Sequence, residues 1–152
     1  MELDFIYKAF STEDLAAAIA GIRGLGIRGC GVSMPYKEAC IPYLDELDPP
    51  TGALQAVNTI VNDNGHLRGH NTDYIAVAKL LEQHGVSHEL SFALRGSGGM
   101  AKAVTGALHD AGFRSGIILA RNETTGRPLA ETYGYEWRTE LGAAQPDLVI
   151  SV

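Results

Sequence analysis

Three polar side chains stand at the ends of predicted strands and are of types that together could perform acid–base chemistry: Lys37, Asn58 and Asp73. A carboxylate can hold a lysine ammonium in place, and such a pair can exchange a proton with a bound hydroxyl group. An asparagine amide both donates and accepts hydrogen bonds, which suits a ligand rich in hydroxyl groups. The three residue types therefore indicate a site for a polyhydroxylated molecule.

Each of these residues also has an ordinary structural interpretation. A lysine in a first helical turn is usually solvated, and an aspartate at that place often caps the helix. An asparagine at the edge of a strand or turn is equally common. The spacing of Lys37, Asn58 and Asp73 alone leaves both interpretations open.

A glycine-rich segment lies between a predicted strand at 91–94 and a predicted helix at 100–111. Because glycine has no Cβ, the backbone N–H groups of such a turn and the positive end of the helix can approach a pyrophosphate. The segment therefore predicts a dinucleotide site, with an ordinary tight turn as the alternative. Its residues are Gly96, Ser97, Gly98, Gly99, Met100 and Ala101.

Arg121 ends the next predicted strand, about 25 residues after the first glycine. Dinucleotide enzymes place at this strand end either an acid, which binds the ribose 2′-OH of NAD, or a cation, which binds the 2′-phosphate of NADP. Arg121 favours NADP, while Glu123 leaves NAD open. An exposed arginine without a ligand is the alternative interpretation.

The elements that must position these residues alternate between strand and helix. Short apolar runs predict strands at 3–10 and 27–33. Between them, apolar residues at helical spacing predict a helix whose capping box joins Ser11 to Asp14. A proline well placed to open a helix predicts another one over 36–45.

A proline-rich stretch at 48–52 is predicted to be a loop. The segments 56–61 and 66–70 are predicted to pair as a hairpin, since Asn64-Gly65 supplies the residues that tolerate positive φ in its turn. A helix over about 72–83 follows and carries Asp73 near its start.

After residue 84 the pattern becomes that of a parallel sheet. A strand at 91–94, a helix at 100–111 and a strand at 116–120 form a predicted βαβ unit. A helix near 125–133 and a strand at 147–152 continue the alternation. The chain is therefore assigned to the α/β class.

Two domains are predicted on this basis. Residues 1–84 form an N-terminal α/β substrate-binding and catalytic domain, and residues 85–152 form the first half of a Rossmann-type nucleotide-binding domain. Side chains that leave the strand ends of the two parts would converge on one cleft.

Composition excludes several other classes of protein. The 152 residues carry 18 acidic and 12 basic side chains, a net charge of -6, which disfavours binding to nucleic acid or to an anionic membrane. Cys30 and Cys40 lack the spacing of a zinc site or of a disulfide scaffold, so no metal is expected. Without a basic leader or a long apolar run, the sequence predicts a soluble cytoplasmic protein.

Four segments together resemble the shikimate dehydrogenase family, in its order and at its kind of spacing. Any one of the four is a weak signal, whereas four in register across almost the whole chain are strong. They are Gly29–Glu38 (GCGVSMPYKE), Ala56–Thr59 (AVNT), Gly69–Asp73 (GHNTD) and Gly96–Ala101 (GSGGMA).

The resemblance implies an NADP-dependent oxidoreductase of aromatic amino acid biosynthesis that interconverts 3-dehydroshikimate and shikimate, or acts on a related polyol such as quinate. Lys37 and Asp73 match the family's catalytic pair, Asn58 and Asp73 its ligands for substrate hydroxyls, and Ser33 its substrate-contacting threonine. The glycine segment and Arg121 match the NADP site, with NAD as the other candidate cofactor. The implied assembly is a monomer or a homodimer.

Four residues depart from the family's usual pattern and indicate a paralogue of the biosynthetic enzyme: Gly31, Ser33, Ala76 and Arg95. The family's opening segment and the second half of its nucleotide domain are expected outside these 152 residues. Two alternatives remain open. One is a non-catalytic, nucleotide-binding remnant, and the other is an amino acid or folate-type dehydrogenase with a similar nucleotide half.

Overall fold

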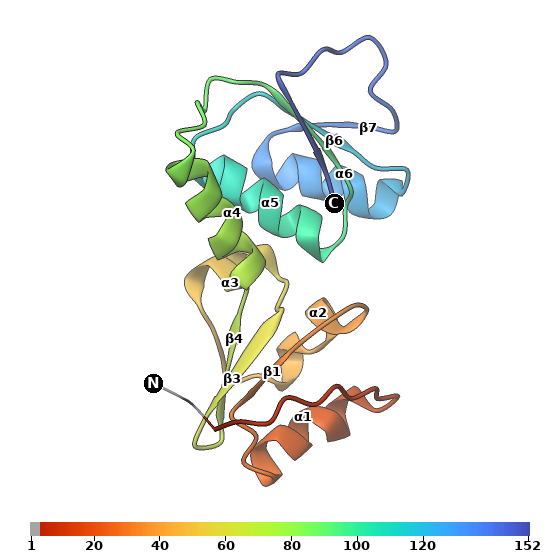
Figure 1. The fold of residues 1–152 in the computed structure, drawn as a ribbon. Coiled ribbons are helices and arrows are strands. Elements are labelled where there is room, and N and C mark those ends of the chain that lie inside the picture. Colours follow the sequence, from red (N-terminus) through yellow and green to blue (C-terminus); the bar gives the residue numbers. More distant parts are fainter. Residues whose placement is uncertain (1–3) are drawn as a thin grey trace.

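The computed structural model describes residues 4–152, which fold around two separate four-stranded sheets (Figure 1). The first sheet is built from residues 29–70 and the second from residues 92–151. Helices alternate with the strands in both parts, which confirms the α/β class. None of the helices in the described part of the chain is both long and apolar enough to cross a bilayer.

The first sheet has the strand order β1-β3-β4-β2. The predicted hairpin is confirmed as its centre, because β3 and β4 pair antiparallel and Asn64 and Gly65 adopt φ values of 53° and 95° in the turn. Strand β1 pairs antiparallel with β3, and the short β2 pairs parallel with β4. The strands are β1 (Gly29–Gly31), β2 (Glu46–Leu47), β3 (Thr59–Asp63) and β4 (His66–His70).

Side-chain caps fix where the helices of this part begin. Asp14, Asp48 and Asn71 each accept a hydrogen bond from the backbone N–H three residues later, which satisfies a donor that the helix itself cannot. The predicted helix over 72–83 is confirmed. The elements are α1 (Leu15–Gly24), α2 (Tyr36–Ala39), the 3₁₀ helix η1 (Ile41–Tyr43), α3 (Pro49–Leu54) and α4 (Thr72–Gln83).

Several local predictions for this part are wrong. Residues 4–10 of the predicted strand at 3–10 form no strand and are exposed, since no strand of the described chain pairs with them; Leu3 lies outside the described residues. Asp14, not Ser11, caps α1. The predicted helix over 36–45 ends at Ala39 and gives way to η1, because the residue before Pro42 is disfavoured in the α conformation.

The predicted loop at 48–52 is also wrong, because residues 49–54 form α3. Proline at the first positions of a helix loses no hydrogen bond, and Asp48 caps the free N–H groups. The two prolines therefore open a helix instead of preventing one.

The second sheet is entirely parallel and has the order β7-β6-β5-β8. In chain order its strands lie 3-2-1-4, the arrangement of a doubly wound dinucleotide-binding fold, and the order reverses between β5 and β8. The βαβ prediction is thereby confirmed. The elements are β5 (Phe92–Arg95), α5 (Gly99–Asp110), β6 (Gly116–Leu119), α6 (Glu123–Tyr133), β7 (Glu136–Arg138) and β8 (Leu148–Ser151).

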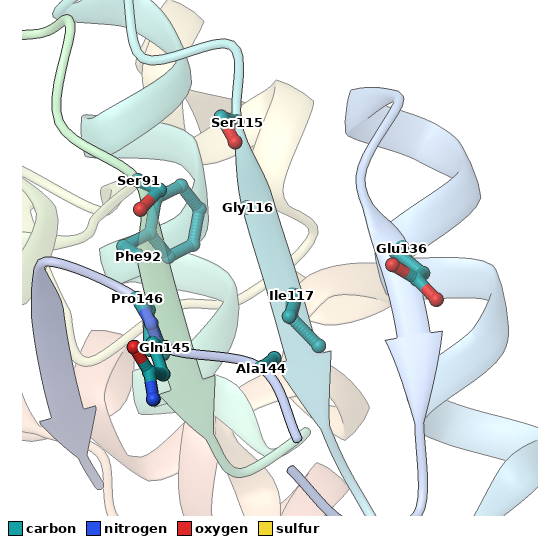
Figure 2. Close-up of a pocket in the computed structure, with 9 residues that line it drawn as sticks. All are labelled: Ser91, Phe92, Ser115, Gly116, Ile117, Glu136, Ala144, Gln145 and Pro146. Atoms are coloured by element: carbon teal, nitrogen blue, oxygen red, sulfur yellow. The ribbon is translucent and has the colours of Figure 1, made fainter. Parts of the chain in front are cut away.

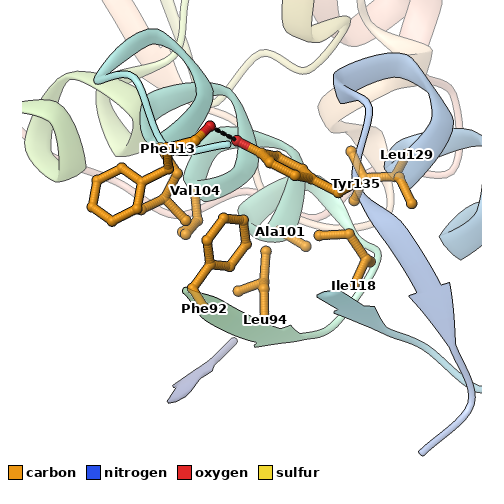
Figure 3. Close-up of a cluster of buried hydrophobic side chains, with 10 residues drawn as sticks. Phe92, Leu94, Ala101, Val104, Phe113, Ile118, Leu129 and Tyr135 are labelled. Atoms are coloured by element: carbon orange, nitrogen blue, oxygen red, sulfur yellow. Dashed lines mark hydrogen bonds between the residues drawn. The ribbon is translucent and has the colours of Figure 1, made fainter. Parts of the chain in front are cut away.

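Each sheet has its own hydrophobic core. In the second, Phe92 lies edge-on to Phe113 and Tyr135, and Tyr135 Oη donates a hydrogen bond of 2.9 Å to the Phe113 carbonyl (Figure 3). Helix α4 lies between the two parts in the chain, but its Val77 and Leu81 pack against this second core. The domain boundary after residue 84 stays a prediction, with α4 as the element that joins both sides.

Candidate functional site

Lys37 and Asp73 form an ion pair, with 2.8 Å between Lys37 Nζ and Asp73 Oδ2. Lys37 lies on α2 and Asp73 in the first turn of α4, where the helix dipole favours a negative charge. Their side chains are 20% and 26% exposed, so the pair is shielded from bulk water yet open to a ligand. The sequence-predicted pair is therefore brought together by the fold.

Hydrogen bonds of the segment 56–58 fix the elements that carry Lys37 and Asp73 relative to each other. Val57 N–H donates to the Lys37 carbonyl at 2.7 Å, and Asn58 N–H donates to the His70 carbonyl at 3.0 Å. The buried Asn71, which caps α4, also donates from its amide to the Ala56 carbonyl at 2.8 Å. One short segment thus ties α2, β4 and the start of α4 together.

Asn58 directly precedes β3, and its side chain contacts Thr72, the first residue of α4. Its Oδ1 accepts from Thr72 N–H at 2.9 Å, and its Nδ2 lies 3.0 Å from Thr72 Oγ1. These contacts fix which way the amide faces. Thr72 was not predicted as a site residue, although its place between Asn71 and Asp73 in the GHNTD segment was a usable signal.

Ser33 is the least constrained of the predicted residues. It is exposed, lies two residues after β1 and is joined to α2 through its backbone, since its carbonyl accepts from Tyr36 N–H at 2.9 Å. The structure therefore places Ser33 on the path into α2, without a direct contact to Lys37 or Asp73 among the hydrogen bonds of residues 4–152.

The glycine segment turns sharply from β5 into α5. Gly96 has φ +136°, and a Cβ there would lie 2.8 Å from the Val152 side chain, so this position requires glycine. Gly98 occupies the N-cap of α5 and offers no side-chain cap to its first N–H groups. Met100 is 40% exposed and Ala101 is buried in the core. The turn leaves the start of a twelve-residue helix open to an anion.

Gly99 brings this turn and the ion pair together. A Cβ on Gly99 would lie 3.1 Å from Lys37 Cδ, so the aliphatic part of the lysine packs directly on the glycine segment. The sequence predicted both features but not their contact. The Lys37–Asp73 ion pair and the start of α5 therefore lie next to each other.

Arg121 is exposed just after β6 and directly before Asn122, the N-cap of α6. Glu123, the acidic residue that left NAD open, forms an ion pair of 2.8 Å with Arg127. The Arg127 guanidinium also lies over the Trp137 ring, 4.8 Å from its centroid. The Glu123 carboxylate therefore pairs with Arg127. The ion pairs within residues 4–152 do not include Arg121.

Comparison with known proteins finds similarity to one family. Residues 1–60 match the model of the shikimate dehydrogenase substrate binding domain. A shikimate dehydrogenase-like protein of Haemophilus influenzae is 53% identical over 150 residues, which are 99% of this chain and 55% of that protein. The chain is therefore similar to the shikimate dehydrogenase family over nearly its whole length.

Two further proteins of this family are also similar to the chain. The NADP(+) shikimate dehydrogenase of Moorella thermoacetica is 43% identical over 84% of this chain and 44% of its own length. The Thermus thermophilus shikimate 5-dehydrogenase, solved with NADP(H) and shikimate, has a TM-score of 0.82 at 28% identity and covers 94% of this chain and 54% of that one. The chain thus spans about half the length of the family members it matches.

Cys40 carries a thiol close to Lys37. Its Sγ donates to the Lys37 carbonyl at 3.7 Å, and the residue is fully buried. Burial raises the pKa of the Cys40 thiol to about 11, more than its backbone hydrogen bond lowers it. Burial likewise raises the pKa of Cys30. Cys40 therefore stays protonated near neutral pH and acts as part of the core.

Proposed function

We propose that this chain supplies the acid–base pair and the pyrophosphate turn of an NADP-dependent oxidoreductase that interconverts shikimate and 3-dehydroshikimate, or a related polyol such as quinate. The contact between Lys37 and Gly99 carries the proposal. In this contact the stem of Lys37, whose ammonium pairs with Asp73, lies against the segment that we expect to hold the cofactor. In this proposal the enzyme works in the cytoplasm, as a monomer or a homodimer, on a free small-molecule substrate.

In the oxidation direction, Lys37 takes the proton of a substrate hydroxyl while a hydride leaves the carbon that bears it. Asp73 holds Lys37 in place and accepts a hydrogen bond from a second hydroxyl. Asn58, oriented by Thr72, and Ser33 position the ring. Bound NADP supplies the hydride acceptor, and the protein supplies orientation and proton transfer.

The residues of the glycine segment and Arg121 fit a dinucleotide with a 2′-phosphate. Gly98 faces open space at the start of α5, since a Cβ there would have no neighbour within 4 Å, and this leaves room for a pyrophosphate. Arg121 supplies a cation where a 2′-phosphate is bound in such folds, and the pairing of Glu123 with Arg127 removes the competitor for a ribose hydroxyl. We therefore propose NADP before NAD.

This assignment divides the work between the two parts of the chain. Residues 1–84 bind the substrate and carry the acid–base pair, and residues 85–152 bind the nucleotide. Calorimetry with NADP and with shikimate addresses this division. NADP binding without binding or turnover of any polyol would favour a nucleotide-binding module over an enzyme.

The decisive experiment replaces Lys37 with alanine in the protein that contains this chain. Reduction of NADP is followed with shikimate and with quinate. We expect kcat to fall by several powers of ten (about 10²–10⁴ for a lost acid–base group) with little change in KM. Lys79→Ala, at an exposed lysine on α4, is the matched control and should keep wild-type rates. Near-complete turnover in Lys37→Ala would overturn the mechanism.

A further inference from the structure

Three residues on one face of α5 contact the first part of the chain. Gly99, Lys102 and Gly106 are spaced by three and four residues and so lie on the same side of the helix. Gly99 meets the stem of Lys37, and a Cβ on Gly106 would lie 2.5 Å from Leu54 Cδ2. Both glycines therefore act as notches that let α2 and α3 approach α5.

Lys102, between the two notches, forms an ion pair with Glu38. Its Nζ lies 2.8 Å from Glu38 Oε1, and the two side chains are 23% and 57% exposed. Glu38 directly follows Lys37 on α2. An ion pair this accessible adds little to the stability of a fold. We expect the Lys102–Glu38 pair instead to affect the position and the electrostatic surroundings of Lys37, which directly precedes Glu38.

The charged side chains around Lys37 come from three elements. Asp73 on α4 pairs with Lys37 directly, Glu38 is its neighbour on α2, and Lys102 on α5 neutralises Glu38. Helix α3, which also packs on this face of α5, contains no ionisable side chain, and α6 brings the Tyr133 hydroxyl to 3.3 Å from a Cβ on Gly106. Among the ion pairs of residues 4–152, Lys37 therefore pairs with Asp73, while Glu38 pairs with Lys102.

We infer that Glu38 and Lys102 are positioning residues that dock α2 on α5 and leave Asp73 as the sole carboxylate partner of Lys37. The inference rests on the proposed function of Lys37, but the geometry it uses, the 2.8 Å pair and the Gly99 notch, is independent of the substrate. It assigns to α5 a second task beside nucleotide binding, which is to set the place of the acid–base group.

Removing one partner at a time tests this with effects of opposite sign. Lys102→Met leaves the Glu38 carboxylate unneutralised beside Lys37, which favours the ammonium form and moves the midpoint of the pH profile of kcat/KM to higher pH. Glu38→Gln leaves the Lys102 ammonium unneutralised and moves the midpoint to lower pH. We expect shifts of about 0.3–0.5 pH unit at low ionic strength. A residue that merely supports the fold would not give opposite signs.

A second measurement does not depend on turnover. Acetic anhydride acetylates only the neutral amine, so the pH dependence of Lys37 acetylation, followed by mass spectrometry of the intact folded protein, should shift in the same two directions. The double variant Glu38→Gln/Lys102→Met should return both midpoints close to the wild-type values. Lys102→Arg should also retain them, and about 1 M salt should abolish the shifts. Lys79→Met is the control lysine variant.

Shifts of equal sign, or none at low ionic strength, would overturn the inference. This failure can be told apart from failure of the proposed function. If Lys37→Ala abolishes turnover while the paired variants leave both pH profiles unchanged, only the positioning role is wrong. If Lys37→Ala keeps its turnover while Lys37 acetylation still shifts in opposite directions, the positioning role stands and the catalytic role does not.

Discussion

The amino and carboxyl ends of the parallel sheet both carry polar residues, but they differ in which of their polar groups remain available to a ligand. At the amino end, a hollow of about 200 Å3 is lined by residues that precede or begin the strands, among them Ser91, Ser115 and Glu136 (Figure 2). Two of its polar residues have partners: Ser91 donates from both N–H and Oγ to Asp147, and Glu136 pairs with Arg138.

At the carboxyl end, the glycine segment leaves the start of α5 without a side-chain cap, and Lys37 reaches it from the first part of the chain. Helix N-termini and strand ends converge only here, as they do at the ligand sites of open α/β sheets. A hollow alone does not separate the two ends, because a larger one of about 360 Å3, lined by Glu38, Ser97 and Lys102 among others, lies next to the glycine segment. A more useful sign of a binding site is a group of polar atoms that the fold brings together and that can still bind a ligand.

The largest expected effect concerns the amino end. Phe92 lines the hollow and is also fully buried in the second core. Phe92→Ala should lower the free energy of unfolding by about 3–5 kcal/mol, because it removes a buried ring and leaves a cavity. Denaturant titration measures the loss. NADP affinity of the folded variant should be unchanged, and a large loss of affinity would show that the two ends are coupled.

At the carboxyl end, Arg121→Ala should weaken binding of NADP by about 10- to 100-fold, the effect of losing a hydrogen bond to a charged group. Binding of NAD should change little, because NAD has no 2′-phosphate. Glu123→Gln serves as the neighbouring control, since its carboxylate is paired with Arg127. Equal losses for both cofactors in calorimetry would remove Arg121 from the proposed 2′-phosphate site.

A matched pair of serines gives the smallest effect and the sharpest contrast. Ser97 Oγ lies 2.8 Å from Thr125 Oγ1 at the carboxyl end, and Ser91 Oγ lies 2.7 Å from Asp147 at the amino end. Ser97→Ala should weaken NADP binding a few-fold (about 1 kcal/mol or less) with little effect on stability. Ser91→Ala should do the reverse, and exchanged outcomes would contradict the distinction between the ends.

The stability effect of Ser91→Ala should depend on pH. Hydrogen bonds from the Ser91 side chain, and then from its backbone N–H, lower the pKa of Asp147 below its ordinary value. A lowered carboxyl pKa stabilises the fold above the unfolded-state pKa, and this stabilisation is lost as the pH falls through the folded-state pKa. The difference in melting temperature between wild type and Ser91→Ala should therefore be present at pH 7 and shrink in acid.

Local chemistry in the sequence was sufficient for many elements of the fold. The Asn64-Gly65 turn, the helix over 72–83 and the strand, turn and helix around the glycine segment were predicted because their turn residues and apolar periods are local signals. The predictions around the prolines of α3 and η1 were wrong, because proline can begin one helix and end another. Residues 4–10 carried a strand pattern, yet a strand needs a neighbour to pair with.

The candidate site divides in the same way. The sequence by itself determined which residues could do chemistry, Lys37, Asn58, Asp73 and the glycine segment, because residue type and family pattern are carried by short segments. Only the tertiary structure decided that Lys37 packs on Gly99 and that Glu38 pairs with Lys102. These contacts join residues more than 60 positions apart, and their geometry is set by how closely α2 approaches α5, which no local pattern encodes.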